Sequence, residues 1–308
     1  MHTDMSLWPA WMRYTSEKAR HPDFASQGAN THVDAASDVM TAIAGITLRG
    51  PKEGVVWRGQ ADEAWRLVSK AGREGLPSTQ IYDNERAMIR KARRLGIDGA
   101  QRMGDWEILA RLRHHGAITR LIDCSTDPFV ALWFLCDDDS SDNQGRSVRE
   151  VDGVLLAMKR SQFTEIDRPY SADTYEAAFD NSHHPARMLY ATPPIDARIA
   201  AQRGVFAFYS APESSSVWPE SELGPLSLPS QKWGESPHRR LEKLCGPSGL
   251  ANERGRRQTV FPDVIAVTVR AEVKPILLAM LEQNFGFTRD TMFPDFAGMG
   301  QYSSAVGV

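Results

Sequence analysis

The sequence is poor in cysteine, and this scarcity gives little support to a disulfide-stabilised or zinc-knuckle fold. Among 308 residues there are only three cysteines, Cys124, Cys136 and Cys245, and no two of them form a CxxC pair. Cys136 ends an apolar segment, so we expect it in the core. The N-terminus also lacks a basic stretch followed by an apolar one, which a secretory signal requires. We therefore expect a reduced, cytoplasmic protein.

Neither an excess of one charge nor a long apolar run is present. The formal net charge is −3, with 24% charged and 42% hydrophobic residues, which is ordinary for a globular protein. This balance gives no strong signature of nucleic-acid binding, although it allows a local basic groove. No run reaches the roughly eighteen apolar residues of a membrane span. The composition therefore predicts no membrane partner.

Several familiar site motifs are also missing. The sequence has no GxGxxG after a strand, no Walker loop and no GxSxG elbow. The adjacent His183 and His184 are expected to point in different directions, and no histidine or carboxylate follows at helical spacing. The sequence therefore predicts no metal site.

The periodicity that is present predicts an α+β fold with a mixed, mainly antiparallel sheet surrounded by helices. We expect strands near residues 55, 118, 154, 205 and 265, which do not alternate with single crossover helices. Expected helices cover 33–46, 82–95 and 275–285, and a short amphipathic helix around Trp8, Trp11 and Tyr14. The predicted organisation is an N-terminal helical segment over 1–50 and a domain over 51–308, with a polar insertion at about 213–262.

The stretch from Asp105 to Leu135 is the most informative part of the chain. It predicts a helix, a His-His-Gly break, a short apolar run over 118–122, a polar loop and a buried helix that begins at Pro128. Of the two histidines, we expect His115 to matter and His114 to point elsewhere. The loop contains Asp123, Ser125, Thr126 and Asp127. A polar loop between buried elements is a common place for a functional site.

Two flanking segments add candidate residues. The expected strand Val55–Trp57 ends at Arg58-Gly59-Gln60, where glycine lets a ligand or another chain approach the backbone; the alternative is a surface arginine before a turn. Glu85 lies in the expected first turn of the 82–95 helix, where the helix dipole favours an anion. The sequence leaves open whether Glu85 also holds Arg58. Gln202 precedes a late strand, either as an exposed amide or as a ligand contact.

Four blocks of residues together resemble the FRG domain family. The blocks are Trp57-Arg58-Gly59-Gln60; His115-Gly116, Thr119-Arg120, Asp123, Asp127-Pro128 and Ala131-Leu132; Arg198, Gln202, Gly204 and Phe206; and Phe293-Pro294-Asp295. The resemblance runs from about 55 to 300. The chain departs from the family at Cys124, where a tryptophan is usual. Because family members recur in toxin-like and phage-defence-like settings, the resemblance implies such a role without implying a defined activity.

The order of three of these features is also similar to that of ADP-ribosyltransferases. Arg58 at a strand end, Ser125-Thr126 before a buried helix and Gln202 before a late strand follow that order. This analogy implies NAD as cofactor, with Arg58 on its pyrophosphate, Ser125 and Thr126 on the nicotinamide ribose and Gln202 on the ribose 2′-hydroxyl. Glutamine lacks the negative charge that would stabilise an oxocarbenium ion. Asp123 or Glu85 would then have to supply it.

Three functions remain open at this stage. The first is an ADP-ribosyltransferase-like enzyme with Arg58, His115, Asp123 and Gln202 as catalytic candidates. Its predicted NAD contacts are Arg58, Gly59, Gln60, Thr119, Arg120, Ser125 and Thr126. It would modify a macromolecular target or hydrolyse NAD, as a toxin or defence effector with an antitoxin or partner protein. The second is a module that binds or hydrolyses nucleotides or nucleic acid, in which His115, Arg58, Arg120 and Asp123 act on phosphates. The third is a non-catalytic interaction module whose polar residues hold the core together.

Overall fold

A computed structural model describes residues 11–15, 31–65, 67–137, 147–166, 187–193, 196–209 and 264–295, together with residues 145, 175, 176, 179 and 298. The chain divides into two compact units. Unit 1 comprises residues 1–65, 125–162 and 225–288, and unit 2 comprises residues 66–124, 163–224 and 289–308. The chain therefore passes between the units several times, and each unit is assembled from distant segments.

The described residues of unit 1 contain four strands in the order β1 (Trp11–Thr15), β8 (Val264–Val269), β4 (Gly153–Lys159) and β2 (Val55–Gln60). β1 runs parallel to β8, whereas β8 with β4 and β4 with β2 are antiparallel. Every residue of β8 and all but the last of β4 are buried. The mostly apolar sequences of these two strands, with Thr268 in β8 and Lys159 at the end of β4 as exceptions, match their central positions, because a strand buried on both faces needs no polar alternation.

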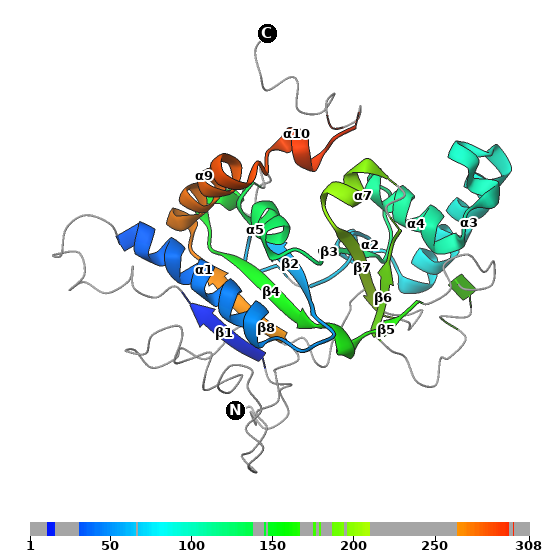
Figure 1. Ribbon diagram of the computed structural model, residues 1–308. Helices are drawn as coiled ribbons and strands as arrows, with labels where there is room; N and C mark the ends of the chain where they lie inside the picture. Colours follow the sequence, from blue (N-terminus) through cyan, green and yellow to red (C-terminus); the bar gives the residue numbers. More distant parts are fainter. Residues whose placement is uncertain are drawn as a thin grey trace, which may run out of the picture. The chain divides into compact units, whose positions relative to one another are not determined.

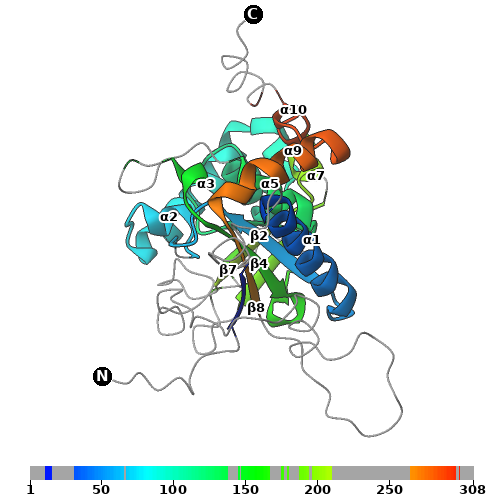
Figure 2. The ribbon, with the colours of Figure 1, turned by 90° about the vertical axis from the view of Figure 1, so that its left-hand side faces the viewer.

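Three helices cover one face of this part of the sheet, as Figures 1 and 2 show. α5 (Pro128–Cys136) packs on β2 and β4, and α1 (Thr31–Arg49) packs on β8. Both contact α9 (Lys274–Phe285), which places all three on the same side. α5 starts where the sequence predicts, because Pro128 occupies its first turn and the Asp127 carboxylate accepts a hydrogen bond from Phe129 N at 2.8 Å.

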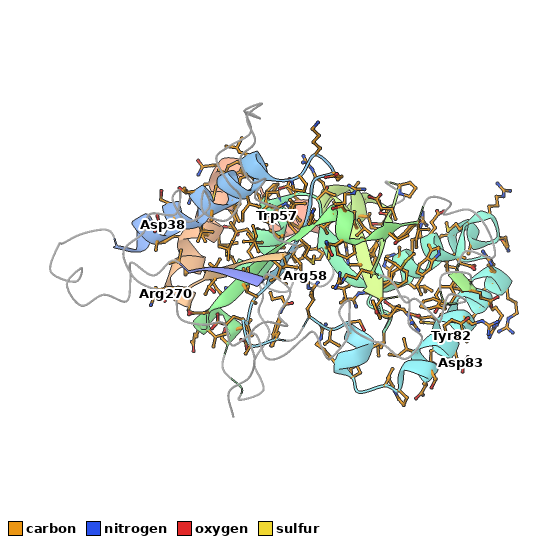
Figure 3. All side chains as sticks on the ribbon, turned by 90° about the horizontal axis from the view of Figure 1, so that it is seen from below. Asp38, Trp57, Arg58, Tyr82, Asp83 and Arg270 are labelled. Carbon is orange, nitrogen blue, oxygen red and sulfur yellow. The ribbon has the colours of Figure 1, made fainter. Side chains whose placement is uncertain are left out.

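Close packing of α5 on β2 explains the glycine of the Trp-Arg-Gly sequence. A Cβ atom at Gly59 would lie 1.9 Å from the carbonyl oxygen of Ala131 in α5. Side chains alternate along a strand, so Trp57 leaves β2 on the same face as Gly59 and Arg58 leaves it on the other. Arg58 therefore points to the face opposite α5. Trp57 and Arg58 are both labelled in Figure 3.

Unit 2 contains the strands β3 (Ile122–Ser125, whose last residue belongs to unit 1), β7 (Gly204–Tyr209), β6 (Arg187–Ala191) and β5 (Thr164–Glu165), in that order. β6 and β7 are antiparallel, and β5 and β6 are parallel. Its helices are α2 (Lys70–Arg73), α3 (Ser78–Leu95), α4 (Asp105–His114), α7 (Ala197–Ala201) and α10 (Arg289–Met292). Short 3-10 helices complete the described elements at Ile97–Arg102 in unit 2 and at Val148–Glu150, Arg160–Gln162 and Ala271–Val273 in unit 1.

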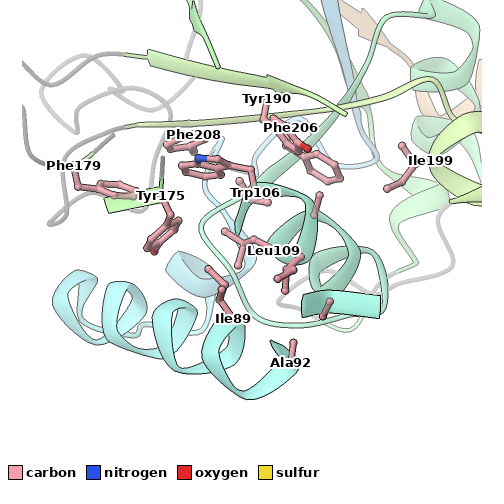
Figure 4. Close-up of a cluster of buried hydrophobic side chains, with 14 residues drawn as sticks. Ile89, Ala92, Trp106, Leu109, Tyr175, Phe179, Tyr190, Ile199, Phe206 and Phe208 are labelled. Atoms are coloured by element: carbon pink, nitrogen blue, oxygen red, sulfur yellow. The ribbon is translucent and has the colours of Figure 1, made fainter. Parts of the chain in front are cut away.

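An aromatic core holds unit 2 together (Figure 4). The fully buried ring of Trp106 stacks on Phe208, with 4.6 Å between the ring centroids, and joins α4 to β7. Tyr175 and Phe179 pack against the same tryptophan, while Ile89 of α3 belongs to the same cluster. Large rings of this kind supply much of the apolar area that a unit of this size must bury.

The structure confirms the predicted α+β class and the mostly antiparallel sheet. It does not confirm the predicted N-terminal aromatic helix, because Trp11–Thr15 is a strand. The three-residue spacing of the aromatic residues suits a helix, but pairing of this segment with β8 decides its conformation. Trp8 lies outside the described residues. In the described part of the chain, no helix is long and apolar enough to cross a lipid bilayer.

Arg58, Gly59 and Gln60 form the end of β2, as predicted. Two other predicted boundaries are wrong. β3 begins only at Ile122, so Asp123 and Ser125 belong to a strand and not to a loop. α3 begins at Ser78, which places Glu85 well beyond its first turn.

One strand, β6, lies in a segment that the sequence predicts to be mostly loop. The predicted insertion at 213–262 and the pair His183 and His184 lie outside the described residues. The predicted division at residue 50 remains a prediction.

Candidate functional site

Four polar side chains from three parts of unit 2 meet at one place, which we call the His114 cluster: His114, Asp196, Arg198 and Asp295. His114 is the last residue of α4. Asp196 caps α7 by accepting a hydrogen bond from Arg198 N at 2.9 Å. Asp295 follows α10. The cluster therefore depends on segments that are far apart in the sequence.

Arg198 is the residue that ties the cluster together. Its Nη2 donates to Asp295 Oδ1 at 2.7 Å, and its Nη1 donates to the carbonyl oxygen of His114 at 3.3 Å. Its Nε lies 2.7 Å from Asp295 Oδ2 as an ion pair, and its guanidinium carbon lies 4.9 Å from the centre of the Phe293 ring. Because the His114 carbonyl is at the C-terminus of α4, a cation there is also favoured by the helix dipole.

The surroundings shift the pKa values of two residues of the cluster, His114 and Asp295. Burial, followed by the positive charge of Arg198, lowers the pKa of His114 to about 4, against the opposing influence of Asp196 and Asp123. Burial alone would raise the pKa of Asp295, but hydrogen bonds from Arg198 and Gly298 N and the charge of Arg198 hold it below its usual value. At neutral pH the imidazole is therefore neutral and the carboxylate is charged.

His115 and Asp123, two of the predicted catalytic residues, are accessible beside this cluster. The His115 side chain is 52% exposed, and its Nε2 lies 4.0 Å from Asp196 Oδ2. Asp123 is 46% exposed and forms an ion pair with Arg113, whose Nε donates to Asp123 Oδ2 at 3.1 Å. The expectation that His114 points elsewhere is wrong, since its Nε2 lies 3.9 Å from Asp196 Oδ1.

Arg120, a predicted nucleotide contact, is instead buried in the core of unit 2. Its backbone N and its Nε both donate to the Glu85 carboxylate at 2.7 Å, and Tyr175 Oη donates to the same carboxylate at 2.6 Å. Burial and the neighbouring Glu85 raise the pKa of Tyr175 far above its usual value. Thr119 is also buried, and its hydroxyl accepts from Leu121 N at 3.3 Å. These residues stabilise the fold.

Gln202 likewise has a structural contact. It ends α7, and its Nε2 donates to the carbonyl oxygen of Met292 in α10 at 2.9 Å. This bond joins two helices of unit 2 and orients the amide. The predicted contact of Gln202 with a ribose hydroxyl remains a prediction.

In unit 1, Trp57 pairs with Ser125. This pairing brings the Trp57-Arg58-Gly59-Gln60 block close to Ser125 and Thr126. The Ser125 hydroxyl accepts from Asp127 N at 3.0 Å and so supports the start of α5. Gln60 is buried, and its Nε2 donates to the carbonyl oxygen of Trp65 at 2.8 Å. Arg58 is half-buried, and Thr126 is exposed. Of the predicted nucleotide contacts in unit 1, these last two side chains are the most accessible to a ligand.

Comparison with known proteins finds a family match for one part of the chain. Residues 53–144 match the family model of the FRG domain. This range contains the Trp-Arg-Gly and His115 blocks, whereas the Arg198 and Asp295 blocks lie outside it. No curated protein and no solved structure matches the chain. This part of the chain is therefore similar to the FRG domain, in agreement with the resemblance of its motifs.

Proposed function

We propose that this FRG-domain protein binds NAD or a similar nucleotide through Arg58 and uses it for ADP-ribosyl transfer or NAD hydrolysis. The observation that carries the proposal is the pairing of Trp57 with Ser125 within unit 1, which brings Arg58 and the Ser125-Thr126 pair close together. These are the first two features of the ADP-ribosyltransferase order in the sequence.

Arg58 has the chemistry that a pyrophosphate requires. A guanidinium offers several N–H donors in a planar fork, and charge-assisted bonds of this kind are about twice as strong as neutral ones. Its position opposite α5 keeps it out of the packed helix layer. Thr126, exposed beyond the end of β3, adds a hydroxyl that can contact a ribose.

Isothermal titration with NAD tests the binding step. We expect micromolar binding by the full chain and a loss of about tenfold to a hundredfold in Arg58→Ala, since a hydrogen bond to a charged group contributes about 1.5–3 kcal/mol. Arg149→Ala is the matched control, because Arg149 also belongs to unit 1 but pairs with Asp137. Equal affinity in the Arg58→Ala and Arg149→Ala variants would refute the role of Arg58.

Turnover needs a separate measurement. Release of nicotinamide, with or without labelling of a protein target, would report hydrolysis or transfer. For the proposed toxin or defence role in the cytoplasm, expression of the wild-type chain should slow cell growth, and Arg58→Ala should relieve this effect. A partner or antitoxin would be sought by co-purification with the wild-type chain.

A second candidate function is phosphate-ester hydrolysis in unit 2. It is favoured by the exposed imidazole of His115 beside Asp196 and the His114 cluster. A histidine next to a carboxylate can transfer protons during such a reaction. Hydrolysis of a nucleotide that is lost in His115→Ala but kept in Arg58→Ala would support this function over the first.

A further inference from the structure

We propose that His114, Asp196 and Asp295 bind one divalent transition-metal ion, with Zn²⁺ as the best fit. One ligand atom from each of the three residues lies within 4.8 Å of the other two. The residues come from the end of α4, the cap of α7 and the segment after α10. This site goes beyond the proposed nucleotide binding, which depends on Arg58 in unit 1.

The buried imidazole of His114 is a second observation that points to a ligand. Its Nε2 has no hydrogen-bond partner among the described residues, and the side chain is only 7% exposed, so this nitrogen has little access to solvent. An unpaired buried polar atom costs about 1–3 kcal/mol. An unprotonated imidazole nitrogen can donate its lone pair to a metal ion. A bound ion would therefore satisfy this atom.

The donor set favours zinc over magnesium or calcium. One imidazole nitrogen and two carboxylate oxygens suit Zn²⁺, whereas Mg²⁺ and Ca²⁺ prefer oxygen ligands alone. The 3.9 Å between His114 Nε2 and Asp196 Oδ1 is too long for a hydrogen bond. Two ligands of a tetrahedral zinc ion lie roughly 3.3 Å apart, so a small side-chain movement would bring these atoms onto one ion. Three protein ligands leave a further position open, as in catalytic zinc sites.

Arg198 has two opposing effects on such a site. Its positive charge lowers the affinity for a cation. It also fixes the Asp295 carboxylate through contacts at 2.7 Å, and such outer contacts commonly orient metal ligands. The two carboxylates outweigh its single charge. We therefore expect micromolar rather than tighter binding.

Zinc titration of the full chain, after dialysis against a chelator, tests the proposal. A chromophoric zinc indicator would report affinity, and elemental analysis would report stoichiometry. We expect one Zn²⁺ per chain and at least about a tenfold loss of affinity in His114→Ala and in Asp196→Asn. Asparagine can still cap α7, so Asp196→Asn should fold. Asp83→Asn, which changes an exposed carboxylate of α3, is the matched control and should bind normally.

Circular dichroism would verify that each variant is folded before its affinity is compared. Absence of zinc binding by the wild-type chain would overturn the proposal. So would unchanged binding in folded His114→Ala or Asp196→Asn, because the ion would then lie elsewhere. Arg58→Ala should bind zinc normally, which separates this result from the test of nucleotide binding.

Discussion

Replacing Glu85 by alanine is expected to lower the free energy of unfolding of unit 2 by about 3–5 kcal/mol. Glu85 is fully buried and Arg120 is 2% exposed, so the pair is shielded from water. The change removes the acceptor of three hydrogen bonds and leaves a guanidinium without its partner. Because domains are typically stable by only about 5–15 kcal/mol, this loss would be a large share of the total.

Urea unfolding followed by circular dichroism would measure this loss. Asp83→Ala is the control, since Asp83 lies on the same helix but is exposed (Figure 3). The double variant Glu85→Gln/Arg120→Met should be more stable than Glu85→Ala, because it leaves no unpaired buried charge. A loss below about 1 kcal/mol in Glu85→Ala, equal to that of the control, would refute the argument that the pair is desolvated.

Three further predictions follow from single contacts. Gly59→Ala should lower the free energy of unfolding by several kcal/mol, on the order of an overpacked core, because its Cβ would overlap the carbonyl oxygen of Ala131. Urea unfolding would measure this loss, and Gly204→Ala, whose Cβ would have ordinary contacts, is the control. Lys274→Ala should lower the free energy of unfolding by about 2–5 kcal/mol, because Lys274 Nζ donates to two buried carbonyl oxygens at 2.6 Å. The control Lys52→Ala should change this free energy little, because Lys52 is exposed. In metal-free protein, the free energy of unfolding should fall as the pH drops from 6.5 to about 4. In this range His114 binds a proton in the unfolded chain but not in the folded one, because its pKa is lowered by folding. His114→Gln should flatten this pH dependence.

Features that depend on local pattern could be predicted from the sequence. The apolar runs of β4 and β8, the buried α5 with its Asp127-Pro128 start, and the α9 helix follow from periodicity and capping. The similarity of residues 53–144 to the FRG domain also follows from local motifs. Such features involve residues close together in the chain, so a single sequence is enough to predict them.

Which polar residues meet could be learned only from the folded chain. Arg120 pairs with Glu85 rather than with nearby Asp123, and Trp11–Thr15 becomes a strand because β8 lies beside it. The His114 cluster joins residues from distant segments. In the sequence, Arg198 and Asp295 belong to two separate blocks, and no pattern places them beside His114. Periodicity reports which face of an element is buried, but not which element lies against that face. The partners of charged side chains therefore depend on tertiary packing.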